Sequence, residues 1–229
     1  KPVRVDPSHI LDAAQHVFAL NGVDGSSIRA IAKEAHCDPS LLYYHFENKE
    51  AIFVAILERK FSRFMPDLED IASTHNEQKR DGAQRCLCNE QGRTPLQEAL
   101  WQTLEMFHKH VKDDAGFRGM IRGSIATNQN FAQIELIKYV SRIIKIVKEY
   151  LRDGVESGEL RQDMNLDTTT FFFIRTCVDI LDFFPVVSAR LMSMSLDEAI
   201  ELAEKQWFQL FWAGVKNDQP QPPQYSLIK

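Results

Sequence analysis

The sequence predicts an all-α protein, and three observations support this. Ten glycines and nine prolines in 229 residues are fewer than the roughly 12% of an average chain, whereas a β-sandwich or barrel needs many turn residues. Apolar residues recur at steps of three and four along most of the chain, which is the period of an amphipathic helix. Helix start and stop signals flank these stretches.

Three short helices are expected in the first 50 residues. The first covers residues 8–20, between a start signal at Asp6-Pro7 and an end signal at Asn21-Gly22. Only His36-Cys37 separates the second helix from the third, which opens at Asp38-Pro39. Two helices joined by so short a turn should cross steeply, as in a helix-turn-helix.

A larger helical region is expected after these first 50 residues. Its first helix runs from Asn48 to about Pro66, and a polar loop follows at about 73–94, because that stretch has little apolar surface to bury. A kink or break is expected at Pro185, and the proline-rich tail 218–229 is expected to be flexible. Five more helices are expected, at residues 95–113, 117–127, 134–157, 168–192 and 196–215.

Charge and cysteine content narrow the class of protein. A net charge of −5 excludes a strongly basic nucleic-acid coat protein, although it allows a local basic face. Four cysteines are too few for a disulfide framework, and no apolar stretch approaches the roughly 18 residues of a membrane span. We therefore expect a cytoplasmic protein without membrane contact. The sequence begins at Lys1 without methionine, which leaves room for a longer native N-terminal arm.

Residues 28–49 read IRAIAKEAHCDPSLLYYHFENK, and this segment resembles the TetR family of DNA-binding regulators. The family pattern is an isoleucine-alanine step, a tight turn, and a short helix with aromatic residues before a lysine. The family usually has glycine in the turn, which suggests a positive φ at His36, and histidine tolerates this region with modest strain. The matching positions are Ile31-Ala32, His36-Cys37, Tyr43, His45, Phe46 and Lys49.

The resemblance implies the domain organisation. Residues 1–50 would form a helix-turn-helix DNA-binding domain, and residues 51–217 a helical ligand-binding and dimerisation bundle. The helix from Lys49 to Phe64 would connect the two.

The resemblance also implies which side chains contact DNA. Tyr43, His45 and Lys49 are expected to bind phosphates, and Arg29 to make a bidentate contact with guanine. The alternative is that the aromatic residues only form a helical core. Three successive helical positions span about 200°, so a core does not readily accommodate Tyr43, Tyr44 and His45 together. The other expected DNA contacts are Ser27, Pro39, Ser40, Leu41 and Tyr44.

A homodimer on a palindromic, double-stranded DNA operator is expected, because two helix-turn-helix units related by a twofold axis read two half-sites. The last two predicted helices are aromatic, and the final one is apolar on more than one side, so it needs two partners. The alternative is a larger monomeric core. The expected interface residues are Phe183, Phe184, Trp207, Phe208, Phe211 and Trp212.

The resemblance further implies a small hydrophobic effector that releases a repressor from its operator. Its apolar pocket would lie between helices of the second domain, with Asn128 and Arg175 as polar fixtures. An ordinary core or surface role is the alternative for each candidate. The expected apolar lining is Trp101, Phe107, Met120, Phe131 and Phe173.

A metal- or thiol-redox-responsive regulator is the alternative function, with Cys86 and Cys88 as the sensing residues. Their C-x-C spacing differs from the C-x₂-C of a zinc site, and no second pair exists. The sequence contains none of the nucleophile-elbow, metalloprotease, P-loop or dinucleotide-binding motifs. We therefore expect no enzymatic activity, no metal and no cofactor.

Overall fold

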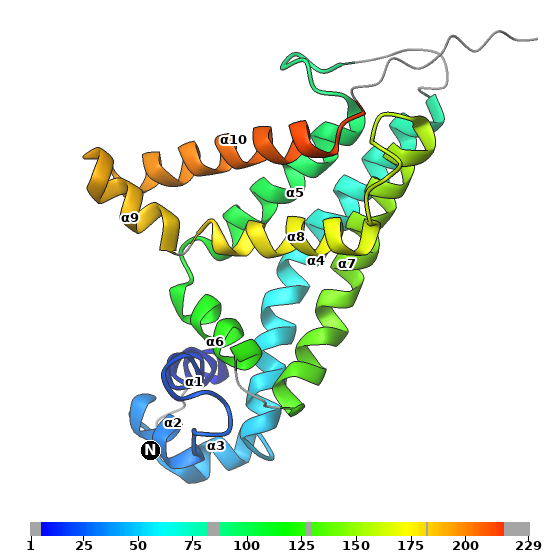
Figure 1. Ribbon diagram of the computed structural model, residues 1–229. Coiled ribbons are helices and arrows are strands. Elements are labelled where there is room, and N and C mark those ends of the chain that lie inside the picture. The colour runs from blue at the N-terminus through cyan, green and yellow to red at the C-terminus, as the bar shows by residue number, and fades with distance from the viewer. Residues whose placement is uncertain (1–5, 82–87, 127–129, 182, 218–229) are drawn as a thin grey trace, which may run out of the picture. The chain divides into compact units, whose positions relative to one another are not determined.

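A computed structural model describes residues 6–81, 88–126, 130–181 and 183–217. Within these residues the protein is all α-helical, as predicted, and has ten helices (Figure 1). The extended pairing in this part is a single bridge between Leu160 and Lys216. The helices are α1 Pro7–Asn21, α2 Ile28–Glu34, α3 Pro39–His45, α4 Lys49–Asp81, α5 Pro95–Val111, α6 Ala115–Ala126, α7 Asn130–Ser157, α8 Leu166–Asp179, α9 Phe183–Met192 and α10 Leu196–Val215.

The first three helices begin and end where their local signals predict. The Asp6 carboxylate accepts the Ser8 amide at 3.0 Å, and α1 ends at Gly22 with φ 69°. The Asp38 side chain caps α3 in the same way, at 2.8 Å. His36 has φ 50°, which confirms the left-handed backbone expected in the turn.

Helix α4 is longer than predicted, and the polar loop expected at about 73–94 is wrong at its start. The helix continues through Pro66 to Asp81. A proline within a helix removes one backbone hydrogen bond, which favours an end at that point. Leu68 and His75 lie beyond the proline and are buried, so packing stabilises the continued helix.

A break in the helix expected over residues 168–192 is confirmed, but it lies before Pro185. The stretch expected as one helix forms α8 and α9, and α8 ends at Asp179. Pro185 is the third residue of α9. In the first turn of a helix the missing N–H of proline has no intrahelical acceptor to lose. The predicted tail, residues 218–229, lies outside the described residues.

The chain divides into two compact units, and helices α4, α5 and α7 belong partly to each. The first unit comprises Lys1–Leu68 and Lys109–Arg142, and the second comprises Glu69–His108 and Ile143–Lys229. The first unit therefore combines α1, α2 and α3 with α6. None of the helices in the described residues has both the length and the apolar character needed to cross a lipid bilayer.

Candidate nucleic-acid interface

All nine predicted DNA-contact residues lie at the surface of the first unit. Ile31, Ala32 and Leu42 are buried and hold α2 against α3, so the opposite faces of these short helices are open. Tyr44 is 81% exposed and Tyr43 is 61% exposed, which argues against a core role for these two rings. Ser27, Arg29, Ser40, Tyr43 and Tyr44 are exposed, and Pro39, Leu41, His45 and Lys49 are half-buried.

Two of the predicted contact residues also have structural roles that the sequence analysis missed. The Lys49 ammonium donates to the backbone carbonyls of Asp24 at 3.0 Å and Ser26 at 3.1 Å, so it holds the loop between α1 and α2. This uses two of its three protons and leaves one for a phosphate oxygen. The Ser27 hydroxyl accepts the Ala30 amide at 3.2 Å and caps α2.

Two acidic side chains beside the exposed surface have local partners. Glu34 accepts from His16 at 2.8 Å, which ties α2 to α1. The side-chain and backbone hydrogen bonds from Ser40 lower the pKa of Asp38, so this capping carboxylate is charged at neutral pH. Arg29 stands exposed on α2 near these two carboxylates in sequence. Local pairing thus reduces the repulsion that an acidic chain presents to DNA.

Residues 10–56 match the family described as bacterial regulatory proteins, tetR family. The matched stretch contains α2, α3, most of α1 and the start of α4. The helix-turn-helix segment of this chain is therefore similar to the DNA-binding segment of the tetR family.

Regulators are among the proteins of similar sequence. The HTH-type transcriptional regulator UidR of Escherichia coli is 40% identical over 68 residues, which are 28% of this chain and 35% of UidR. The chain thus spans about a third of the length of this first relative. The fatty acid metabolism regulator protein of Bacillus subtilis is 25% identical over 163 residues, 69% of this chain and 72% of that protein.

Solved structures share the fold over nearly the whole chain. The transcriptional regulator FadR of Bacillus subtilis in complex with stearoyl-CoA has a TM-score of 0.63 and 18% identity, and covers 91% of this chain and 99% of its own. The ketosteroid regulator KstR2 of Mycobacterium tuberculosis has a TM-score of 0.62 and 19% identity, and covers 93% of this chain and 96% of its own. At these identities the likeness shows the fold alone.

The residues predicted to line an effector pocket are divided between the two units. Met120 and Phe131 belong to the first unit, and Asn128 lies outside the described residues. No single unit therefore holds the whole predicted set. The other four belong to the second unit: Trp101, Phe107, Phe173 and Arg175.

Within the second unit, the predicted candidates have close neighbours. Phe107 and Phe173 are buried. Arg93 stacks over the Trp101 ring at 4.9 Å. Arg175 pairs with Asp179 one turn later on α8, at 2.7 Å.

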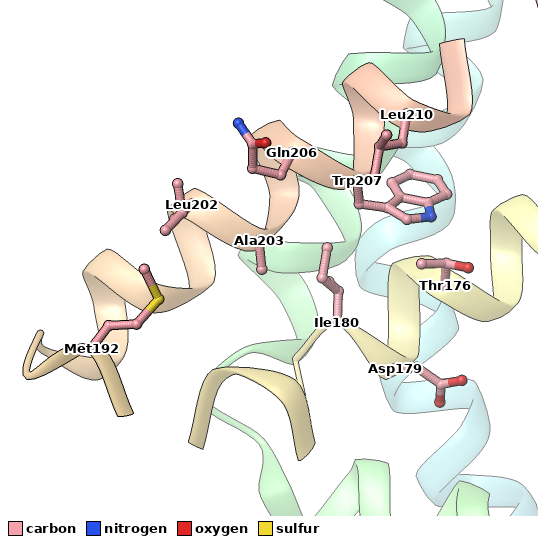
Figure 2. A pocket seen from close by; sticks show the side chains of 9 residues that line it. All are labelled: Thr176, Asp179, Ile180, Met192, Leu202, Ala203, Gln206, Trp207 and Leu210. Atoms are coloured by element: carbon pink, nitrogen blue, oxygen red, sulfur yellow. The ribbon is translucent and has the colours of Figure 1, made fainter. Parts of the chain in front are cut away.

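The structure contains a pocket that the sequence analysis did not predict, between α8, α9 and α10 (Figure 2). Its volume is about 620 Å³ and its walls are mainly apolar. Trp207 is the one lining residue that the sequence analysis had singled out, as an interface residue. The pocket is lined by Thr176, Asp179, Ile180, Met192, Leu202, Ala203, Gln206, Trp207 and Leu210.

One predicted interface residue needs correction. Phe208 is buried in the core of its own unit, where its ring meets Trp101 at 5.1 Å. It follows Ile200 and Glu204 at four-residue steps along the buried face of α10, so this chain leaves little of its ring exposed. Trp207, Phe211 and Trp212 are half-buried, and the side chains of Phe183 and Phe184 lie outside the described residues.

Other apolar side chains are exposed on the same helices. Phe171 and Phe172 on α8 are each 62% exposed, and Leu210 on α10 is 73% exposed. Leu202 belongs to the same side of α10 as Leu210, two turns earlier. Leu202 and Leu210 also line the pocket, and we call Phe171, Phe172, Leu202 and Leu210 the open apolar face of α8 and α10.

The metal and thiol alternative gains no support from the described residues. Among them, no three His, Cys, Asp or Glu side chains lie where they could hold a metal ion. Cys88 is exposed, and Cys86 lies outside the described residues. His108 bonds Glu204, and His110 bonds Asp67 at 2.8 Å, so each imidazole has its own carboxylate partner.

Proposed function

We propose that this protein is a ligand-responsive transcriptional repressor that binds a DNA operator as a homodimer. The observation that carries the proposal is the pair of exposed aromatic side chains, Tyr43 and Tyr44, on a capped helix within the stretch that matches the tetR family. Tyrosine, a large aromatic side chain with a polar end, is enriched at binding interfaces.

On DNA, α3 would enter the major groove and the flanking groups would hold the backbone. Tyr43 would donate its hydroxyl to a phosphate, and Lys49 its remaining proton. Arg29 is exposed at the start of α2, from where its fork would bind guanine. Phosphate contacts position the protein, and the arginine contact contributes sequence preference.

The open apolar face of α8 and α10 would be the dimer interface. In a monomer, Phe171, Phe172 and Leu210 would expose their rings and methyl groups to water. A second copy related by a twofold axis would place the same helices against them, and its side chains would fill the pocket. Such a dimer matches a palindromic operator.

The proposed effector is a small hydrophobic molecule bound in the second unit, with the buried rings of Phe107 and Phe173 as candidate walls. The similarity in sequence to a fatty acid metabolism regulator makes an acyl-CoA the first class to test. Release from DNA requires that the effector bind more tightly to a conformation in which the two recognition helices no longer match the half-sites.

The DNA-binding proposal is tested with a duplex selected from random sequence, followed by fluorescence anisotropy at several salt concentrations. Tyr43→Phe and Lys49→Ala should weaken binding to all duplexes about equally, whereas Arg29→Ala should reduce the preference for the selected sequence. Lys205→Ala, which removes an exposed cation from α10, serves as the charge control. Unchanged affinity in all three test variants would overturn the DNA-contact assignment.

The effector class is tested by adding stearoyl-CoA to the preformed complex with DNA. Release of the duplex as stearoyl-CoA saturates is the expected result. A complex that persists at saturation would exclude long-chain acyl-CoA as the effector and leave the DNA-binding assignment intact.

A further inference from the structure

The N-terminal head, residues 1–49, contains four of the seven histidines of the chain: His9, His16, His36 and His45. It also holds five lysines and arginines against six aspartates and glutamates, so its net charge is −1 when the histidines are neutral. Histidine is the side chain whose charge ordinarily changes between about pH 5 and pH 8. Protonation of all four would bring the net charge of the head to +3. The sign of this charge, which decides whether the head attracts or repels DNA, therefore depends on pH.

Two of these histidines join α1 to the end of α2. The Nε2 atom of His9 lies 3.2 Å from the carbonyl oxygen of Ala35, and the Nδ1 atom of His16 lies 2.8 Å from the carboxylate of Glu34. The two histidines are seven residues apart, so they project from the same side of α1. Both partners accept hydrogen bonds, and a bond from a charged imidazole is stronger than one from a neutral imidazole. Protonation therefore tightens the contact between α1 and α2.

Further carboxylates of α1 flank the two imidazoles. The hydrogen bonds from Ser8, with a smaller contribution from His9, lower the pKa of Asp6 at the start of the helix. Asp12 follows His9 by three residues and pairs with Arg59 of α4 at 2.8 Å. Protonation of the α1 histidines therefore adds cations to a surface that already carries several anions.

Other charged groups of this surface belong to α2 and to the segment before α6. Lys33 is exposed on α2. Asp114, which precedes α6, accepts the side-chain amide of Gln15 at 2.6 Å and pairs with Lys60 of α4. Carboxylates, lysines and arginines ordinarily keep their charge between about pH 6 and pH 8. The histidines are therefore the groups through which the charge of the head responds to pH in this range.

His36 and His45 lie beside the predicted DNA contacts. His36 is exposed in the turn between α2 and α3, and His45 is the last residue of α3 and is half-buried. Among the described residues, neither imidazole forms an ion pair. The carboxylates nearest in sequence are Asp38, which caps α3, and Glu47. A proton added to His36 or His45 is therefore available to a DNA phosphate.

We propose that pH regulates DNA binding by this protein, because the four histidines of the head take up protons when it binds DNA. Affinity then rises as the pH falls from about 8 to about 6. His36 and His45 contact phosphates directly, whereas His9 and His16 are positioning residues that hold α2 against α1. The inference rests on the proposed function, since it concerns the regulation of the same DNA-binding surface.

The size of the effect follows from proton linkage. Each proton taken up on binding lowers Kd by up to about tenfold for each unit by which the pH falls. An average uptake of about half a proton between pH 8 and pH 6 therefore lowers Kd about tenfold. An imidazolium that contacts a phosphate also displaces a counterion, which steepens the dependence of log Kd on log salt concentration by about 0.9. A positioning histidine changes the pH dependence and leaves this salt dependence unchanged.

The test measures Kd for a duplex selected from random sequence at pH 6 and pH 8, at constant ionic strength and with the full chain. Fluorescence anisotropy gives Kd, and circular dichroism checks folding at both pH values. One variant combines His36→Gln with His45→Gln, a second combines His9→Gln with His16→Gln, and a third carries all four substitutions. Glutamine keeps an N–H donor and does not titrate. His110→Gln is the matched control, because His110 bonds Asp67 outside the head.

The wild type and the His110→Gln control should bind about tenfold more tightly at pH 6 than at pH 8. Each double variant should keep a ratio of about threefold, and the quadruple variant should show none. The salt dependence at pH 6 should become shallower in the His36 and His45 variant alone.

Equal wild-type Kd values at the two pH values would overturn the inference, and so would a tenfold ratio that persists in the quadruple variant. If substitution of His9 and His16 prevents folding, the ratio in the His36 and His45 variant decides. A wild-type protein that binds no duplex at either pH would instead overturn the proposed function.

Discussion

Substitution of Leu210 by glutamate tests whether the open apolar face of α8 and α10 is a dimer interface. Leu210 is 73% exposed, so the isolated chain loses little packing when it is replaced. Complete burial of a leucine side chain contributes about 1.5–3 kcal/mol. Covering the exposed part in a dimer therefore stabilises each subunit by about 1–2 kcal/mol.

In a twofold-symmetric dimer each subunit buries its own Leu210, so the two side chains together contribute about 2–4 kcal/mol. Since 1.4 kcal/mol is a factor of ten, the dimer Kd should increase by a factor of between about 30 and about 1,000. The glutamate adds a negative charge to a pocket that Asp179 also lines, and burying this charge in the interface acts in the same direction.

Sedimentation equilibrium at several protein concentrations measures the dimer Kd directly. Leu20→Glu is the matched control, because Leu20 is 70% exposed on α1, in the other unit. The control should leave the dimer Kd unchanged. A Leu210→Glu protein that dimerises with the wild-type Kd would refute the assignment of this face.

Three further predictions concern stability. Gly154→Ala should lower the free energy of unfolding by about 1–2 kcal/mol in a urea titration. The added Cβ would lie 2.5 Å from a Leu96 methyl, and this overpacking outweighs the gain in helix propensity. An unchanged unfolding midpoint would contradict this packing. The stability difference between wild type and Asp114→Asn should be constant above about pH 5 and shrink as pH falls below about 4. Burial opposes ionisation of Asp114, but hydrogen bonds from Lys60 and the Phe117 amide outweigh it. The pKa of Asp114 is therefore lower in the folded protein than in the unfolded chain, so the carboxylate stabilises the fold above the unfolded-state pKa. This stabilisation is lost as pH falls through the folded-state pKa. A stability difference between the two proteins that persists at pH 2 would contradict the prediction. Ser195→Ala should cost about 1 kcal/mol in the same titration, because the hydroxyl caps α10 in a capping box, and Ser141→Ala, on the exposed side of α7, should change little.

The helix-turn-helix was predictable from the sequence because its signals are local. The caps at Asp6 and Asp38 are bonds between a side chain and an amide two residues later. The left-handed turn at His36 is likewise set within a few residues. Such short-range contacts can be read along the chain, and the exposed positions of Tyr43 and Tyr44 follow from the helix period.

In the second half of the chain, the sequence predicted the positions of most helices. It did not predict which face of each helix is buried. Pro66 is a local signal for a helix end, yet α4 continues, because residues beyond it are buried, His75 against Tyr150 from a distant part of the sequence. The aromatic residues of α10 looked alike in the sequence. Phe208 turns inward against Trp101, whereas Leu210, which the sequence analysis left out of the interface, is 73% exposed.

The sequence by itself determined the fold class, the helix-turn-helix and the exposed positions of Tyr43 and Tyr44. The tertiary structure alone decided which face of α10 is open and how α6 holds α1. Gln15 and Asp114 are 99 residues apart, and neither carries a local signal that names the other. Capping and helical periodicity depend on residues three or four positions apart, so they can be recognised in the amino-acid sequence. A half-buried carboxylate that joins three helices exists only after the chain has folded around it.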